Sequence, residues 1–460
     1  MSTWQEYLTT HRQRILDDYL ELVRIPSISS YAESAGDVRL AAEWVARRLT
    51  AAGVASVEVL ETGGHPVVYG DWLGAPGKPT ILLYGHFDVQ PADPFEAWDS
   101  PPFEPTVRDG RVYGRGASDM KGSVVLMIAA VEAMLKTEGR LPVNVKFFLE
   151  GQEEIGSPQV AALLTREKAR FAADLAINAD GGQWDENTPG LLVGTRGSTG
   201  VQIDLRGPNA DLHSGLYGGP IANPNHALAA LLTSMRGADG RILIEGFYDD
   251  VAELTAADRA LIASVPFDLE AFKASVGVDG LGGETDFAPL ERLWTRPTLE
   301  ITGMWGGYTG PGSKNVLPAE AHAKVSTRLV PNQDPRKIQE LIAAHVARNT
   351  PPGITATVVR RDGGAHPYLI PPEHWANQAA AAALETLFGR PPVFFRMGAT
   401  VPVLELFRTH LGIDSITVGL AGFDEGAHAP NEFFRLSNFD RGIATYGVVL
   451  EALAGANRGA

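Results

Sequence analysis

The sequence predicts an α/β protein, in which a doubly wound sheet forms one domain and a smaller α+β domain is inserted into it. Short apolar runs bounded by breaker residues alternate with helical patterns at both ends of the chain, as strands buried between two layers of helices do. The middle of the chain instead carries strands that alternate apolar and polar residues, which is typical of a sheet with one solvated face. A chain of 460 residues is also long for a single core, so two domains are expected.

Changes in this pattern set the expected domain boundaries. Residues 1–197 and 373–460 are predicted to form the two parts of the α/β domain, and residues 198–372 the inserted domain. In the inserted domain, the order strand, helix, strand and helix, with alternating strands, favours a small α+β domain with its helices on one face.

Each expected element follows from the spacing of its apolar residues and from the residues that end it. Gly53, for example, ends a helix that begins near Asp37, and a turn with Gly110 joins the two short strands of a hairpin over 106–113. Helices are predicted at 3–23, 37–52, 123–136, 224–235, 335–347, 375–388, 403–411 and 436–453. Other strands are predicted at 57–60, 67–69, 81–85, 143–149, 175–179, 200–205, 321–330, 354–359, 393–395 and 415–418.

Composition argues against several classes of function. The net charge of −16 disfavours a nucleic-acid or anionic-membrane partner. The chain has no cysteine, so a metal ion would have to be held by His and carboxylate side chains. No secretory signal and no apolar run of membrane-spanning length is visible, so we expect a cytoplasmic protein.

The most informative strand is the apolar run 81–85, which leads directly into His86 and Asp88. Ligand sites in open α/β sheets lie beyond the carboxyl ends of strands. Residues two apart in extended chain point to the same side, and a metal-binding His usually donates its other ring N–H to a carboxylate or carbonyl group. The pair therefore indicates a metal ligand with a supporting carboxylate, although a His-x-Asp pair on its own also fits a capped loop.

Further acidic residues stand beside other predicted elements. Asp119 lies in a glycine-rich stretch directly before a helix, where it also fits a helix cap. Glu153 and Glu154 follow the strand at 143–149, and Asp180 follows a later strand. Neighbouring residues in extended chain point in opposite directions, so Glu153 and Glu154 are expected to have different functions, unless both belong to a solvated loop.

Five candidate metal ligands thus belong to the predicted α/β domain: His86, Asp119, Glu154, Asp180 and His428. Mixed imidazole and carboxylate ligands suit zinc, cobalt or manganese. Five ligands are too many for one catalytic ion that keeps an open position, but they suit two divalent ions if one carboxylate bridges them. Paired ions of this kind make a nucleophile from water and polarise a carbonyl group.

With these residues in place, the chain resembles the dinuclear-zinc metallopeptidases, a family that includes carnosine-type dipeptidases, aminoacylases, succinyl-diaminopimelate desuccinylase and glutamate carboxypeptidase. The matching motifs are residues 85–91, 114–122, 150–157 and 211–215, which occur in the family's order. The motif around His213 and the stretch 246–250 look most like the dipeptidase branch. The resemblance implies an α/β catalytic domain carrying an inserted lid and dimerisation domain.

The resemblance also implies roles for the residues of the catalytic domain. Asp119 would bridge two divalent ions, most simply zinc, with manganese or cobalt as alternatives. His86 and Asp180 would complete one metal site, and Glu154 and His428 the other. Asp88 would support His86, and Glu153 would be the general base. The family pattern also predicts a cis peptide bond after Asp119.

In the inserted domain, the resemblance implies residues that bind the substrate. His213 would reach the partner's active site in a homodimer and stabilise an oxyanion, although a His in a surface loop is the simpler interpretation. Asn315 and Arg328 would hold the substrate, and the loop with Ala399 and Thr400 would offer backbone N–H groups to its carboxylate. Relatives carry glycine where Ala399 stands, which puts the shape of that pocket in question.

The sequence therefore predicts a metal-dependent hydrolase that cleaves dipeptides with a free carboxylate. An N-acyl amino acid deacylase is the alternative within the family, and a non-catalytic small-molecule binding protein is the alternative from another class. An intact Glu153 favours an enzyme, because a binding protein needs no general base. Spacing does not decide whether His366 or His374 supplies a second His to the site.

Overall fold

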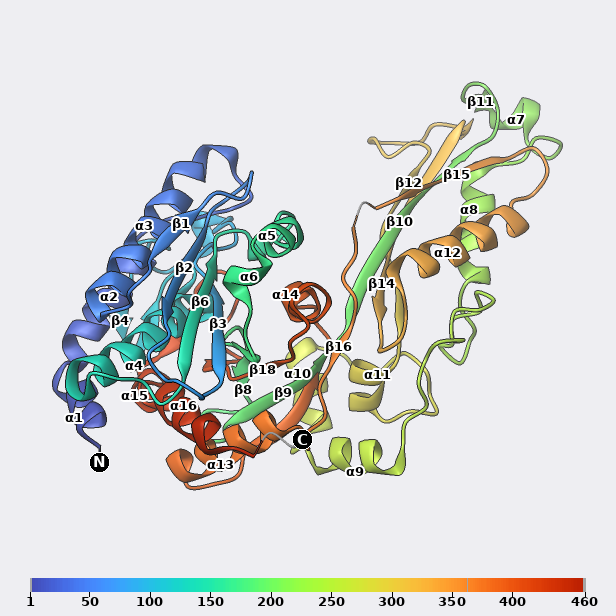
Figure 1. Cartoon of the computed structure of the whole chain (residues 1–460). Coiled ribbons are helices and arrows are strands. Elements are labelled where there is room, and N and C mark those ends of the chain that lie inside the picture. The colour runs from blue at the N-terminus through green and yellow to red at the C-terminus, as the bar shows by residue number, and fades with distance from the viewer. Residues whose placement is uncertain (1, 362, 458–460) are drawn as a thin grey trace. The chain divides into compact units, whose positions relative to one another are not determined.

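The computed structural model describes residues 2–361 and 363–457, and the chain forms two compact units (Figure 1). The first unit comprises Met1–Val193, Ile370–Phe395 and Val403–Ala460, and the second comprises Gly194–Leu369 and Arg396–Pro402. The segment Arg396–Pro402, which the sequence analysis placed in the α/β domain, therefore groups with the second unit. The backbone explains this difference, because the Arg196 N–H donates to the carbonyl of Ala399 at 3.0 Å.

The first unit is built on a mixed sheet whose central strands are parallel. The strand order is β1 (Glu58–Leu60), β2 (Val67–Trp72), β6 (Asn144–Glu150), β3 (Thr80–His86), β7 (Leu175–Asn178), β18 (Ser415–Thr417) and β9 (Gly190–Thr195), with β17 (Val393–Met397) beside β9. The strands β6, β3, β7 and β18 run parallel, and β2 and β9 are antiparallel to their neighbours. The carboxyl ends of the parallel strands consequently meet at one edge of the sheet.

Helices cover both faces of this sheet (Figure 1). One layer contains α1 (Thr3–Thr10), α2 (Arg12–Val23), α3 (Ala35–Ala52), α4 (Gly122–Glu138), α15 (Leu436–Gly442) and α16 (Thr445–Gly455), with α13 (Trp375–Phe388) packed on α16. The other contains α5 (Val160–Arg166), α6 (Lys168–Phe171) and the turn η5 (Phe407–Leu411), which follows α14 (Pro402–Leu406). Helix α4 is buried along most of its length, as its apolar sequence requires. The predicted doubly wound α/β class is confirmed.

Two predicted helices are interrupted. The helix expected over 3–23 divides at His11, whose ring nitrogen Nδ1 lies 2.8 Å from the carbonyl of Tyr7 and whose ring stacks on the Tyr7 ring. The helix expected over 436–453 divides after Gly442, which is a poor helix former. Apolar spacing runs through both breaks, so the spacing gave no sign of either.

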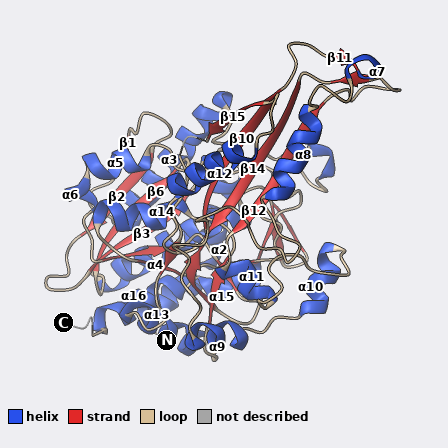
Figure 2. Cartoon of the chain, turned by 90° about the vertical axis from the view of Figure 1, so that its right-hand side faces the viewer, coloured by secondary structure: helices blue, strands red, loops and turns tan. Residues whose placement is uncertain are grey.

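The second unit is an antiparallel four-stranded sheet with helices on one face (Figure 2). The order is β12 (Thr298–Gly306), β14 (Glu320–Leu329), β10 (Gly197–Arg206) and β15 (Thr355–Arg360). Helices α8 (Pro224–Ser234) and α12 (Pro335–Asn349) pack on β10 and β14 over a core that includes Ile203, Leu228 and Ile342. The alternation of apolar and polar residues along β10 and β14 predicted an α+β domain, and the structure confirms this prediction.

Other elements have weak sequence signals and were not predicted. In the second unit these include β12, α7 (Ser214–Tyr217), α9 (Ala256–Ser264), α10 (Leu269–Val276), α11 (Pro289–Thr295) and the short strands β11 (Leu212–His213), β13 (Val316–Leu317) and β16 (Tyr368–Leu369). In the first unit, β8 (Gly182–Gln183) pairs with β19 (Ala421–Gly422), and β20 (Phe433–Arg435) joins the predicted hairpin β4 (Thr106–Arg108) and β5 (Arg111–Tyr113). Among the described residues, no helix is both long and apolar enough to cross a membrane.

Candidate functional site

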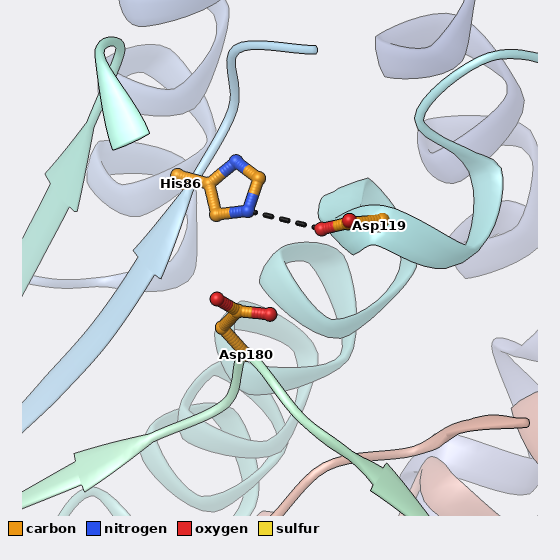
Figure 3. A group of neighbouring side chains, drawn as sticks. All are labelled: His86, Asp119 and Asp180. Atoms are coloured by element: carbon orange, nitrogen blue, oxygen red, sulfur yellow. Dashed lines mark hydrogen bonds and ion pairs between the residues drawn. The ribbon is translucent and has the colours of Figure 1, made fainter. Parts of the chain in front are cut away.

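The candidate metal ligands come from separate elements of the first unit and face one another. His86 is the last residue of β3, and Asp180 lies two residues after the end of β7. Asp119 belongs to the turn η3 (Ala117–Lys121) between β5 and α4, and its peptide bond to Met120 is cis, as the family pattern predicts. Figure 3 shows the side chains of His86, Asp119 and Asp180 converging on one space. Parallel strand ends thus position two of the three groups, and the turn before α4 supplies the third.

Two groups of potential metal ligands share Asp119. One consists of His86, Asp119 and Asp180, and the other of Asp119, Glu154 and His428. Within each group, the ligand atoms lie within 4.8 Å of one another. The Nε2 atom of His86 lies 3.1 Å from Oδ1 of Asp119, and Nε2 of His428 lies 3.0 Å from Oδ2. Each oxygen of the Asp119 carboxylate therefore faces a different group, which is the arrangement that a bridging ligand needs.

The charges of these residues fit divalent cations. Hydrogen bonds with Asp119 and Glu154 raise the pKa of His428 to about 10. Burial and the nearby Asp119 carboxylate raise the pKa of Asp180 to about 7. His86 is fully buried, and the pKa of its ring is raised by hydrogen bonds with Asp119 and Asp88, against the effect of burial. The pKa values of these groups are raised because bound protons reduce the repulsion among the neighbouring carboxylates. Divalent cations would supply the same positive charge.

Asp88 connects the two halves of this centre. Its carbonyl oxygen lies 3.0 Å from Nδ1 of His86, and its carboxylate Oδ1 lies 3.5 Å from the same nitrogen. The carboxylate also accepts hydrogen bonds from the backbone N–H groups of Glu153 at 3.2 Å and Glu154 at 3.1 Å. Asp88 is completely buried. The sequence analysis assigned it the support of His86, and the structure adds the support of the turn η4 (Glu153–Ile155).

Glu153 and Glu154 are adjacent residues of the turn η4, but their side chains have different surroundings. The Oε2 atom of Glu154 accepts a hydrogen bond from Gln90 at 2.8 Å and lies 3.2 Å from Nε2 of His428. The carboxylate of Glu153 has no hydrogen-bond partner among the described residues. Burial, together with the carboxylates of Asp180 and Glu154, raises the pKa of Glu153 well above its usual range, against the effect of His86. The two carboxylates therefore have different environments: that of Glu154 faces Gln90 and His428, and that of Glu153 is buried near His86 and Asp180.

Glu432 is a functional residue that the sequence analysis did not identify. Its buried carboxylate accepts hydrogen bonds from the backbone N–H groups of Gly116, Ser118 and Asp119 at 2.9–3.1 Å. It also forms a buried ion pair with Arg115 at 2.7 Å. The available signal was an acidic residue directly before the apolar strand β20, because a buried carboxylate needs partners. Glu432 fixes the turn that presents Asp119.

His428 reaches the centre through an unusual backbone conformation. Its φ angle is +65°, in the left-handed region that residues other than glycine seldom adopt. The residue lies in the loop between β19 and β20, and its side chain is about half exposed at 54%. Backbone strain of this kind gathers at functional sites, where surrounding structure maintains it.

In the second unit, the predicted carboxylate-binding residues form a connected group. The Nη1 atom of Arg328, near the end of β14, donates to the hydroxyl of Thr400 at 2.7 Å. Arg196, which the sequence analysis did not identify, donates through Nε to the carbonyl of Gly398 at 2.9 Å and through its backbone N–H to that of Ala399. The signal for Arg196 was an arginine in an otherwise apolar and small stretch, 190–200. Arg196 and Arg328 thus both form hydrogen bonds with the loop 398–400.

His213 and Asn315 lie side by side on an exposed part of the second unit. β11 and β13 pair so that His213 lies opposite Val316, and the Ser214 N–H donates to the carbonyl of Asn315 at 3.1 Å. The His213 ring accepts a hydrogen bond from the Gly215 N–H at 3.0 Å and caps α7. Both side chains are exposed to solvent within this unit.

The two histidines that spacing could not distinguish have different surroundings. His374 caps α13, because Nδ1 accepts a hydrogen bond from the Ala376 N–H at 3.3 Å, and burial lowers its pKa. His366, in the second unit, is half exposed, and its Nε2 lies 3.9 Å from Asp334. His374 therefore has a structural use, and His366 is the more accessible of the two.

Comparison with known proteins identifies the family. Residues 82–452 match the model of peptidase family M20/M25/M40. The chain is 33% identical over 447 residues to Cys-Gly metallodipeptidase dug1 of Schizosaccharomyces pombe, covering 94% of each chain. It is 34% identical to human Beta-Ala-His dipeptidase over 388 residues, covering 83% of this chain and 76% of that protein.

Solved structures agree with these sequence similarities. The M20 family metallo-carboxypeptidase Sso-CP2 from Sulfolobus solfataricus superposes with a TM-score of 0.85 at 33% identity, covering 96% of this chain and 99% of that one. The family predicted from the sequence motifs is confirmed, together with its assignment to the hydrolases. The chain belongs to peptidase family M20/M25/M40.

Proposed function

We propose that this protein hydrolyses the amide bond of dipeptides that have a free C-terminal carboxylate, with two divalent cations as cofactors. The observation that carries the proposal is the pair of ligand groups that share Asp119, with the carboxylate of Glu153 beside them. The names of the relatives support dipeptides as the substrate class, because they include a Cys-Gly metallodipeptidase and a Beta-Ala-His dipeptidase.

The proposal assigns each candidate metal ligand to one or both of the cation sites. His86 and Asp180 would hold one cation, Glu154 and His428 would hold the other, and Asp119 would be the ligand that the two groups share. When bound, such paired cations activate a water molecule and polarise the carbonyl group of the scissile bond. Zinc is the expected metal, since imidazole and carboxylate ligands suit it, and manganese or cobalt could replace it.

Glu153 carries the proton in the proposed mechanism. Its carboxylate takes a proton from the attacking water and delivers it to the leaving amine nitrogen, so that the same group acts as base and then as acid. Its environment supports this role in two ways. Burial raises the pKa of Glu153 and so favours its protonated form, whereas two cations close by would favour the carboxylate form that accepts a proton.

Residues of the second unit bind the substrate in this proposal. Arg328 pairs with the substrate carboxylate, since a guanidinium group binds a carboxylate through two hydrogen bonds. Thr400 accepts a hydrogen bond from Arg328 and so orients it. His213 and Asn315 are assigned to the carbonyl oxygen of the scissile bond, where hydrogen-bond donors stabilise the charge that develops.

We further propose a homodimer that forms through the second unit and lets His213 act in the partner's site. Exposed apolar side chains of that unit support an interface, among them Leu216, Ile301, Met304 and Trp305. Light scattering tests the dimer directly, and a monomer mass at working concentration would contradict it. The cytoplasmic location stays a prediction, which subcellular fractionation can test.

The experiment that tests the function uses metal-stripped protein. The protein is reconstituted with zinc, manganese or cobalt and offered a panel of dipeptides, N-acyl amino acids and longer peptides. Cleavage of dipeptides that returns with metal is the expected result. Cleavage of acyl amino acids alone would assign the protein to the deacylases. Binding of metal without any turnover would favour the non-catalytic alternative.

A carboxypeptidase acting on longer peptides is the second candidate. The similarity to the metallo-carboxypeptidase Sso-CP2 favours it. Removal of the last residue from tripeptides and tetrapeptides at rates equal to those for dipeptides would support this candidate over a dipeptidase.

A further inference from the structure

We propose that a cavity within the second unit receives the side chain of the substrate's C-terminal residue and that this residue is large and apolar. The inference rests on the proposed function, because it takes Arg328 as the group that binds the substrate's C-terminal carboxylate. It goes further by assigning the side-chain preference at that end of the substrate.

The cavity lies beside the proposed carboxylate-binding arginine. Its volume is about 620 Å³, and every lining residue belongs to the second unit. Arg328 and Arg196 contribute to its wall, together with residues of β12 and α11. Sites for small molecules typically have volumes of about 300–1,000 Å³. A C-terminal glycine bound through its carboxylate would leave almost all of this space to water.

At one end of the cavity, the arginine side chains of Arg196 and Arg328 favour binding of an anion. No carboxylate among the described residues lies within ion-pair distance of Arg196 or Arg328. Arg296, another lining residue, is instead neutralised by Glu284, with two hydrogen bonds of 3.0 and 2.8 Å. Burial and the neighbouring Arg328 lower the pKa of Arg196 to about 10, which still leaves it charged at neutral pH. The unpaired positive charge is therefore placed where a substrate carboxylate can bind.

Arg196 is held in place by the protein and shapes the wall of the cavity. Its side chain donates to the carbonyl of Gly398 at 2.9 Å and to that of Arg296 at 3.4 Å. A Cβ atom at Gly398 would lie 2.8 Å from Nη2 of Arg196 and 3.2 Å from the carbonyl of Leu293. Glycine is thus required at 398 for this close approach. The loop thus fixes Arg196, and with it this part of the cavity wall, before substrate binds.

Apolar side chains line much of the rest of the wall, which also includes Arg236, Arg292 and Glu300. Leu290 and Leu299 form its buried part, whereas Leu293 and Phe272 are 40% and 36% exposed. An apolar substrate side chain would cover these exposed surfaces. Burying a Leu or Phe side chain is worth about 1.5–3 kcal/mol, which corresponds to an increase of about 10- to 100-fold in kcat/KM. An acidic substrate side chain would pair with Arg196 but would leave the apolar part of the wall exposed. It would also lie near another carboxylate, because Glu300 lines the cavity.

The test compares alanyl dipeptides that differ in the C-terminal residue alone. With the metal-reconstituted protein, kcat/KM for alanyl-phenylalanine and alanyl-leucine is expected to exceed that for alanyl-glycine by about 10-fold or more. Leu293→Gln places a polar group on the cavity wall and is expected to remove most of this difference between the substrates. Leu73→Gln, at an exposed leucine of the first unit, is the matched control and is expected to change neither rate.

The outcomes separate this proposal from the proposed function. Equal kcat/KM for all alanyl dipeptides would overturn the cavity assignment and leave the dipeptidase function standing. The highest rate for alanyl-glutamate would also overturn it, in favour of an acidic side chain bound by Arg196. A Leu293→Gln variant that loses both rates equally would mean damage to the fold, and Phe272→Gln then provides the second test at another wall residue. Failure to cleave any dipeptide would overturn both proposals.

Discussion

The two units of this chain present their functional residues in opposite ways. In the first unit, the candidate metal ligands are tied to one another and to buried groups: Asp88 supports the backbone of η4, and Glu432 supports the turn that carries Asp119. In the second unit, His213 and Asn315 are exposed and Arg328 lacks an ionic partner among the described residues. The candidate metal ligands thus lie together within one unit, whereas the groups proposed to bind the substrate are exposed or lack an ionic partner among the described residues.

This difference between the units indicates which unit determines catalysis and which determines substrate binding. Buried polar networks are rigid and costly to leave unsatisfied, so they position catalytic groups before substrate arrives. Exposed polar side chains gain most of their interactions on binding. Changes in the first unit should therefore affect chemistry and metal content, and changes in the second should affect substrate binding.

The sharpest comparison within the first unit is between Glu153 and Glu154. Glu153→Gln is expected to keep both cations and to lower kcat by about 10²- to 10⁴-fold, because it removes the proton acceptor alone. Glu154→Gln is expected to lose metal from the group that contains His428. Elemental analysis of desalted protein, together with kcat, measures both effects. Metal loss in Glu153→Gln with full metal in Glu154→Gln would mean that the two roles are exchanged.

His213 tests whether the second unit acts on a partner. His213→Ala is expected to lower kcat by about 10²- to 10³-fold, as loss of an oxyanion donor does. A mixture of His213→Ala and Glu153→Gln chains, unfolded and refolded together, is expected to recover about a quarter of the wild-type activity, because half of the two-fold symmetric dimers then contain one intact site. Recovery of no activity by a mixture that does form dimers would show that His213 acts within its own chain.

Metal removal should make the stability of the first unit depend on pH. Without cations, the pKa of His428 is raised from 6.5 to about 10 and that of Asp180 from 3.8 to about 7. The folded state then binds more protons than the unfolded state between these values, so stability falls as pH rises through both ranges. Cations replace the protons, and the reconstituted protein should show a weaker dependence. Melting temperatures of chelated and reconstituted protein across this pH range measure the effect, and parallel curves would contradict it.

The smallest expected effect concerns Thr400. Thr400→Val removes the acceptor of the Arg328 hydrogen bond and is expected to raise KM about fivefold with little change in kcat, since such a bond contributes about 1 kcal/mol. The same change at Thr233, an exposed threonine of α8, is the control. A fall in kcat with unchanged KM would assign Thr400 to the chemical step instead of to binding.

Much of the metal centre could be predicted from the sequence because its residues follow strands with strong signals. The runs before His86, Glu153 and Asp180 are short, apolar and bounded by breakers, and parallel strands bring their ends to one edge. Asp119 and His428 were candidates from residue type alone, and only the resemblance to a family gave them roles. Their loops have no periodicity, and a left-handed backbone at His428 leaves no signal in residue types.

The residues that support the site were harder to predict. Glu432 acts through backbone N–H groups more than 300 residues away in the chain, and Arg196 binds carbonyl groups of the loop 398–400. Such contacts depend on three-dimensional proximity, which single-sequence spacing does not contain. The helices α9–α11 were missed for another reason, because they have only seven to nine residues each, although Thr255 and Asp268 are recognisable caps.

The central claim is that Asp119 bridges two cations, and anomalous diffraction from crystals of the zinc-reconstituted protein tests it most directly. The account predicts two anomalous peaks about 3.5–4 Å apart. One peak should lie among His86, Asp119 and Asp180 and the other among Asp119, Glu154 and His428. A single peak, or two peaks with Asp119 bound to one of them alone, would contradict the claim.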